Sequence, residues 1–342
     1  MNGTLVSVVI SFRNEEPVLK ELVGRLHGSL GVVTEDYELI FVNDASTDRS
    51  LEILRVLSEE DSRVKVINMS RNFGVSQCAL AGIAYSSGDA VVTIDADLQD
   101  PPELIPELIE KWREGSDVVY TVRNSRAGEP SIKLKVTRWA YKVLRVTSDI
   151  DLPIESGDFK LMSRRVVEAL IRLNEKDPFL RGLVRWVGFK QTPVYYSRSA
   201  RFAGESHFRF YGRKAVWNFV SGLTSFSLLP LQAALALGFA VSTGAFLYLI
   251  GVFVMKYLGW NLPGWSAIMA TMLFLGGTQL ITIGVLGLYL GKIYEETKGR
   301  PNYIVESLIG LDSGAQGSKE FDKESARNPE RPRAVAESRR RS

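Results

Sequence analysis

The sequence predicts an α/β domain with a mostly parallel sheet, followed by a two-helix transmembrane hairpin. In the first third of the chain, short apolar runs alternate with segments of helical periodicity, a pattern typical of a parallel sheet with helices on both faces. Further along, no charged residue stands between Lys214 and Lys256, or between Lys256 and Lys292. Each gap exceeds the roughly 20 apolar residues that cross a bilayer.

The alternation in the first part of the chain predicts the order of elements. A loop rich in Gly, Ser, Pro and charge is expected at 124–131, after the last of them. Ser46 or Thr47 is expected to cap the second helix. Strands are expected at 5–11, 37–43, 64–69, 90–94 and 117–122, and helices at 15–30, 47–60, 75–86 and 103–114.

The apolar helices are expected near 228–255 and 266–291, joined by a turn with Trp260 and Trp265, whose rings suit a membrane interface. Two buried helices of a soluble core are the alternative, but soluble helices of this length normally carry a polar face. No signal peptide is expected, because residues 5–12 resemble a strand. Basic residues precede and follow the pair, so the positive-inside rule places both termini and the α/β domain in the cytoplasm, at the inner membrane.

Five segments follow from these patterns. The α/β domain takes residues 1–206, and the two spans take 228–291. Between them, 207–227 is aromatic and basic, which predicts an amphipathic helix in the membrane interface, with packing against the α/β domain as the alternative. Residues 292–310 form a cytoplasmic return segment. Residues 311–342 are rich in Arg and poor in apolar groups, which predicts a disordered basic tail.

Composition excludes several classes of function. The net charge is +3, and basic and aromatic residues do not interleave as a nucleic-acid groove requires, so no nucleic-acid partner is expected. With Cys78 as the lone cysteine, no intramolecular disulfide can form, which fits a reducing compartment. His27 and His207 are the only histidines, which makes a histidine zinc site improbable.

Polar side chains follow three of the predicted strands. Asp95, Asp97 and Gln99 come directly after the run 91–94, Asp44 follows the second strand, and Asn14 and Glu15 follow the first. Because carboxyl ends of parallel strands meet at one rim, where open α/β folds bind ligands, a site is expected there. Two carboxylates and an amide suit Mg²⁺ or Mn²⁺, which complete their shell with water and substrate phosphates. For an isolated Asp-x-Asp, a solvated turn is the alternative.

Six motifs in order resemble glycosyltransferase family 2, and more narrowly the polyisoprenyl-phosphate glycosyltransferases, namely dolichol-phosphate mannose synthases and bactoprenol glucosyltransferases. The resemblance covers roughly residues 5–300. One departure is the usual Asp-Asp-Gly-Ser motif, which here reads Asn43-Asp44-Ala45-Ser46. The motifs are 7–15 (SVVISFRNE), 43–48 (NDASTD), 71–74 (RNFG), 95–101 (DADLQDP), 157–162 (GDFKLM) and 201–206 (RFAGES).

The resemblance implies a GT-A fold, a nucleotide-sugar donor, with UDP-glucose favoured, and a polyprenyl phosphate acceptor in the membrane. It also implies inversion at the anomeric carbon and Mg²⁺ or Mn²⁺ as cofactor. A homo-oligomer such as a tetramer is a further expectation. Carried onto this chain, the family pattern gives Asp95, Asp97 and Gln99 to the metal, Asp95, Asp97 and Asp158 to catalysis, Phe12, Asn14, Glu15, Asp44, Asp95 and Ala96 to the donor, and Arg123, Lys135 and Arg201 to the acceptor phosphate.

Four alternatives stay open. Arg123 and Arg201 could be ordinary surface cations. Asp158 could simply cap the turn into the following strand. Residues 181–186 (RGLVRW) weakly resemble the Gln-x-x-Arg-Trp motif of processive polysaccharide synthases, although Gly182 replaces the glutamine and two spans are few for a translocation channel. A membrane scaffold that keeps the fold without turnover is the non-enzymatic alternative.

Overall fold

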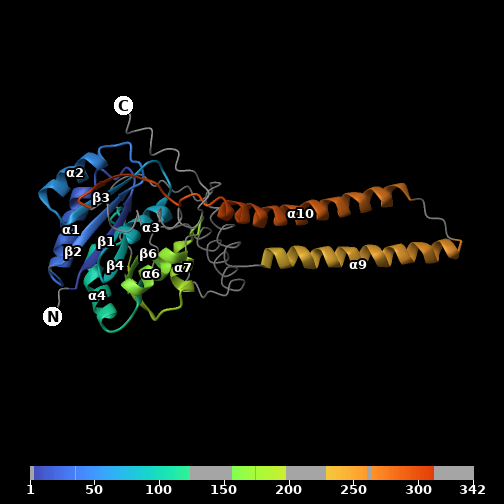
Figure 1. The fold of residues 1–342 in the computed structure, drawn as a ribbon. Coiled ribbons are helices and arrows are strands. Elements are labelled where there is room, and N and C mark those ends of the chain that lie inside the picture. Colours follow the sequence, from blue (N-terminus) through green and yellow to red (C-terminus); the bar gives the residue numbers. More distant parts are fainter. Residues whose placement is uncertain are drawn as a thin grey trace, which may run out of the picture.

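The structure is a computed structural model that describes residues 4–34, 36–123, 156–173, 175–197, 229–259 and 264–311 (Figure 1). The loop expected at 124–131, the interfacial segment at 207–227 and nearly all of the tail at 311–342 lie outside the described residues. Lys135 and Arg201, both predicted to hold the acceptor phosphate, also lie outside them.

The described part of the α/β domain is built on an eight-stranded sheet in the order β7-β5-β6-β4-β1-β2-β3-β8. Strand β1 pairs in parallel with β2 and β4, and β2 pairs in parallel with β3. Strand β6 runs antiparallel to β4 and β5, and β8 antiparallel to β3. The strands are β1 Val6–Phe12, β2 Tyr37–Asn43, β3 Val64–Met69, β4 Ala90–Asp95, β5 Val118–Arg123, β6 Ser156–Ser163, β7 Gln191–Tyr196 and β8 Val305–Ile309.

Helices cover both faces of this sheet (Figure 1). Along β1, Val8 joins the core cluster of α1 and α4, whereas its neighbour Val9 joins the cluster of α3, α6 and α7, as the two-residue period of a strand requires. The predicted α/β class is therefore confirmed. The helices of this domain are α1 Leu19–Gly31, α2 Ser50–Glu60, α3 Val75–Tyr85, the 3₁₀ turn η1 Pro102–Leu104, α4 Ile105–Arg113, α6 Arg164–Leu173 and α7 Leu180–Trp186.

Two helices begin three to four residues later than predicted, because the residues before them form a turn network. The Ser46 hydroxyl accepts a hydrogen bond from the backbone N–H of Asn14 at 3.0 Å, and the Thr47 N–H donates to the Asn14 side chain at 2.7 Å. The residue at the N-cap of α2 is Arg49, which makes no side-chain cap. The prediction that Ser46 or Thr47 caps this helix is thus wrong.

Beyond the α/β domain, two long apolar helices, α9 Leu229–Tyr257 and α10 Trp265–Thr297, lie side by side and project away from the sheet (Figure 1). The stretch Leu229–Met255 has a mean hydropathy of 2.0 and Ala270–Thr297 one of 1.7, and neither is buried. At about 1.5 Å per residue, both exceed the roughly 30 Å hydrocarbon core. Their exposed apolar surface indicates membrane association.

Candidate active site

An acidic rim forms where β4 ends. Strand β4 finishes at Asp95, and the following turn carries Asp97, whose Oδ1 accepts a hydrogen bond from the Gln99 N–H at 3.1 Å. Burial and the nearby carboxylates of Asp158, Asp97 and Asp100 raise the pKa of Asp95 to about 7. Carboxylates crowded in this way repel one another until a cation joins them.

The donor set at this rim suits a hard divalent cation, although it is incomplete. Among the described residues, no group of three or more His, Cys, Asp or Glu side chains is arranged to hold a metal ion. Asp95 and Asp97 supply carboxylates and Gln99 an amide oxygen, and Mg²⁺ or Mn²⁺ fills its remaining positions with water and substrate phosphates. The residues therefore fit such an ion, and their role as ligands stays a prediction.

Asp158 reaches the same rim from β6. Along that strand Phe159 and Leu161 enter one core cluster, so Asp158 and Lys160 point to the opposite face, which α7 covers. Arg181 of α7 donates from Nε to Asp158 Oδ1 at 2.7 Å and from Nη2 to Asp158 Oδ2. Burial opposes ionisation, but Arg181 outweighs it and holds the pKa of Asp158 far below its usual range. Asp158 is a fixed carboxylate.

Arg123, predicted to bind the acceptor phosphate, already contacts other side chains of the domain. Its Nε donates to the Tyr196 hydroxyl oxygen at 3.1 Å, and its Nη2 lies 3.5 Å from Asp100 Oδ2. The Tyr196 hydroxyl donates to the fully buried Asp100. Burial and Asp100 raise the pKa of Tyr196 to about 12. The Arg123 side chain is only 11% exposed, so the phosphate contact predicted for it stays a prediction.

Asp44 and Asn14, predicted for the donor, hold the loops of the donor side together. The Asp44 carboxylate accepts hydrogen bonds from Asn72 Nδ2 at 2.7 Å, from the Phe73 N–H at 2.7 Å and from the Gly74 N–H at 3.1 Å. Asn14 bridges to the turn after β2, as described above, in the left-handed region with φ of 55°. These bonds bring the carboxyl ends of β1, β2 and β3 together at one place.

The remaining predicted donor residues flank that place. Phe12 and Ala96 are buried, at 4% and 3% exposure, and Phe12 packs edge-on against Phe41. Glu15 is also buried, and its N–H donates to the Ser50 hydroxyl at 3.1 Å. Their contacts with a donor stay predictions, but the structure places Phe12 and Glu15 at the carboxyl end of β1 and Ala96 at the carboxyl end of β4.

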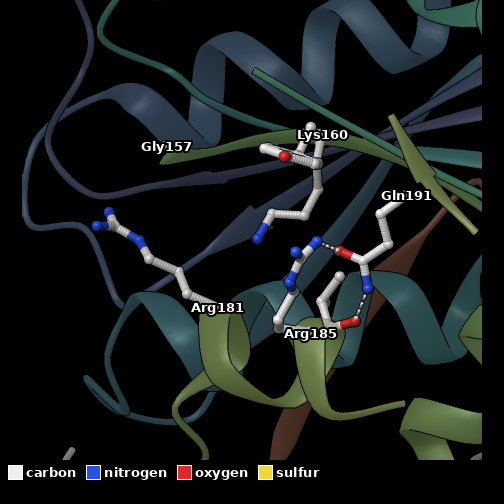
Figure 2. Close-up of a pocket in the computed structure, with 7 residues that line it drawn as sticks. Gly157, Lys160, Arg181, Arg185 and Gln191 are labelled. Carbon is white, nitrogen blue, oxygen red and sulfur yellow. Dashed lines mark hydrogen bonds between the residues drawn. The ribbon is translucent and has the colours of Figure 1, made fainter. Parts of the chain in front are cut away.

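Three cationic residues beside Asp158 were not predicted as site residues. Lys160, Arg181 and Arg185 line a pocket with Tyr120, Gly157, Val184 and Gln191 (Figure 2). Two signals in the sequence pointed to them. Lys160 alternates with apolar residues in the run 157–162, and the two arginines lie in the run 181–186.

Comparisons with known proteins find similar sequences among glycosyltransferases. Residues 7–171 match the family described as Glycosyl transferase family 2. An uncharacterized glycosyltransferase, YkcC of Bacillus subtilis, is 47% identical over 90% of this chain and 95% of its own length. A bactoprenol glucosyl transferase of Shigella phage SfX is 39% identical over 88% of this chain and 99% of its own length.

One of the solved structures that the chain matches is that of glucosyl-3-phosphoglycerate synthase from Mycobacterium tuberculosis, in complex with Mn²⁺, UDP-glucose and phosphoglyceric acid. It is 20% identical, with a TM-score of 0.43, and the match covers 65% of this chain and 79% of that one.

Proposed function

This chain belongs to glycosyltransferase family 2, and on that premise we propose that it transfers glucose from UDP-glucose to a polyprenyl phosphate at the membrane surface, with inversion at the anomeric carbon. The observation that carries the proposal is the gathering of Asp95, Asp97 and Asp158 at one rim, in a chain with two apolar helices. The relatives described as bactoprenol glucosyl transferases support the acceptor and the sugar.

The leaving group is a nucleoside diphosphate, whose charge must be neutralised as its bond to the sugar breaks. Asp95, Asp97 and Gln99 would hold Mg²⁺ or Mn²⁺, which supplies that neutralisation when bound. The close placement of Asp97, Asp100 and Asp158 around Asp95 supports this assignment, because clustered carboxylates attract a cation.

The acceptor does not require a general base. A phosphomonoester has a second pKa of about 6, so at neutral pH it arrives largely ionised and nucleophilic. One of its oxygens bonds to the anomeric carbon, and the electron pair of the broken bond leaves with the diphosphate. Arg181 keeps Asp158 ionised. An ionised carboxylate can accept a hydrogen bond from the sugar or stabilise positive charge on its ring, and it is poorly suited to take up a proton.

The apolar helices give a physical reason for the domain to work at a bilayer. The phosphate of a polyprenyl chain lies at headgroup level, so the enzyme must be held there, and α9 and α10 are long enough to anchor it. We place both ends of the hairpin and the catalytic domain on the cytoplasmic side, since basic residues flank the pair. A tetrameric assembly stays a prediction.

Sugar transfer by the purified protein tests the proposal. The protein in detergent is given undecaprenyl phosphate, Mg²⁺ or Mn²⁺ and a panel of radiolabelled UDP- and GDP-sugars, and label is followed into the organic phase. Label extracted from UDP-glucose alone is the expected result. Label in a water-insoluble polymer would favour a processive synthase, and no transfer from any donor would favour a scaffold.

A further inference from the structure

The cationic pocket lies on the side of Asp158 that faces away from the donor residues. In the sheet order, Asn14 and Asp44 follow β1 and β2 on one side of β4. The pocket is formed by β6, β5, β7 and α7 on the other side. Asp95 and Asp158 therefore separate the expected nucleoside region from the pocket.

Lys160 supplies a charge from the floor of this pocket. Its side chain is almost fully buried, at 3% exposure, and its ammonium group points between the guanidinium groups of Arg181 and Arg185 (Figure 2). Burial and Arg181 lower the pKa of Lys160 to about 8, while Asp158 and Asp95 oppose that shift. A buried ammonium that shares a pocket with two guanidinium groups is stabilised when an anion joins them.

Arg185 is fixed in place before any ligand arrives. Its Nη1 donates to Gln191 Oε1 at 3.0 Å, and Gln191 Nε2 donates in turn to the Val184 carbonyl at 2.9 Å (Figure 2). The guanidinium also lies 5.8 Å from the centre of the Tyr120 ring. Arg181 is oriented by its two bonds to Asp158. Pre-organised guanidinium groups lose little entropy when they bind a phosphate.

We propose that the pocket of Lys160, Arg181 and Arg185 binds the phosphate group of the lipid acceptor. The proposal rests on the function proposed above, because it assigns one of that reaction's two substrates. Three cationic side chains, set against the carboxylate of Asp158, complement a phosphomonoester with a charge of about −1.5 to −2.

The position of the pocket favours the acceptor over the donor diphosphate. In an inverting displacement, the incoming oxygen approaches the anomeric carbon from the side opposite the leaving group. With the diphosphate at Asp95 and Asp97, a sugar at Asp158 would present its open side toward the pocket. Tyr195 and Trp186 are 62% and 59% exposed, and they lie on β7 and α7, two of the elements that form the pocket, so these elements offer apolar surface for an isoprenoid chain.

Direct binding tests this assignment independently of turnover. The full-length protein in detergent is titrated with farnesyl phosphate, with farnesol as the probe that lacks the phosphate, and with UDP-glucose plus Mn²⁺. We expect R185Q and K160M to weaken farnesyl phosphate binding by about 10- to 100-fold, with farnesol and UDP-glucose affected less than about threefold. R172Q, which removes an exposed arginine of α6, is the matched control and should bind like the wild type.

The outcomes separate this inference from the proposed function. Equal weakening of UDP-glucose and farnesyl phosphate would assign the pocket to the donor diphosphate and overturn the inference, as would unchanged farnesyl phosphate binding by R185Q. Arg185 is partly exposed whereas Lys160 is buried, so R185Q keeps the test decisive if K160M fails to fold. Farnesyl phosphate binding that depends on the pocket, in a wild-type protein that transfers no sugar, would instead overturn the proposed function alone.

Discussion

Arg181 donates hydrogen bonds to both carboxylate oxygens of Asp158, from Nε at 2.7 Å and from Nη2. A paired contact of this kind fixes the plane of the carboxylate as well as its charge. Arg181 comes from α7 and Asp158 from β6, so the packing of that helix sets the geometry of the proposed reaction centre.

Replacing Arg181 should change the pH profile as well as the rate. In R181Q, burial and the neighbouring Asp95 are no longer opposed by the guanidinium, so the pKa of Asp158 rises from its depressed value. Turnover should fall about 10- to 100-fold at pH 7 and should fall further as the pH drops, because Asp158 then takes up a proton. The measurement is kcat between pH 5 and 9, and a profile parallel to that of R172Q would contradict it.

Removing Asp97 should abolish turnover without unfolding the domain. D97A takes away a proposed metal ligand at a rim where carboxylates repel, so we expect at least about a 100-fold loss of sugar transfer and an unchanged circular dichroism spectrum. Treating the wild type with EDTA should produce the same loss, and added Mn²⁺ should reverse it. Wild-type turnover by D97A in metal-stripped buffer would remove the metal assignment.

A side chain at position 157 should disturb Arg123. A Cβ atom on Gly157 would lie 3.0 Å from Nη2 of Arg123, which is held by Tyr196 and Asp100. G157A should therefore lower stability by about 1 kcal/mol and raise the KM for the lipid acceptor. Differential scanning fluorimetry and acceptor titration measure both effects. Gly24, where an added Cβ meets nothing within 4 Å, provides the control variant G24A, and equal behaviour of the two would contradict the packing argument.

The affinity for the lipid acceptor should decrease at alkaline pH, because Lys160 loses its charge there. Its pKa is about 8, so it loses its proton as the pH rises past that value, and the affinity for an anionic acceptor should fall. Arginine keeps its charge in this range, so K160R should retain acceptor affinity up to about pH 10. Acceptor KM measured from pH 7 to 10 tests this, and identical curves for the two proteins would refute it.

The lowered pKa of Lys160 should also make the stability of the fold depend on pH. Stability should rise with pH over the range in which acceptor affinity falls. Because the folded-state pKa lies below the ordinary value of 10.5, the folded protein binds fewer protons than the unfolded chain between these values. Lys160 should therefore add stability as the pH rises from about 8 to 10.5, and K160M should lack this increase. Denaturation midpoints of the two proteins across this window provide the measurement.

Strand β8 should be necessary for a stable donor side. Asn43 donates to Asn68 at 2.8 Å, and Asn68 donates to Glu306 of β8 at 2.7 Å. Truncation after Arg300 removes β8, opens the edge of β3 and leaves Asn68 without this acceptor, so the melting temperature should drop by several degrees. Truncation after Leu311 keeps β8 and serves as the control; a similar drop in both proteins would locate the effect in the tail instead.

Local patterns were enough to predict the first five strands and the acidic rim. Runs such as 37–43 and 90–94 are mostly apolar and are followed by Asp44 and Asp95, so both the strand and the place of its polar end can be deduced from adjacent residues. Helix starts were less accurate, because the side-chain bonds of Asn14 with Ser46 and Thr47 join segments far apart in sequence.

Long-range pairing accounts for what the sequence did not predict. Strand β8 is five residues long and half exposed, and it becomes a strand only through its pairing with β3, more than 200 residues earlier. Arg181 likewise meets Asp158 only after α7 packs on β6. The sequence alone could have placed Lys160 on the same face of its strand as Asp158, since both alternate with the apolar Phe159 and Leu161. The alternation does not reveal which other cations lie on that face.

The position of β8 after α10 also fixes an order of assembly. A ribosome makes β3 early but releases its partner only after both apolar helices have emerged, so the edge of β3 stays open throughout their synthesis. Closing that edge is therefore a late step, which follows the synthesis of both apolar helices. A chain whose synthesis stops within those helices would expose an unpaired strand, the kind of surface that chaperones and proteases recognise.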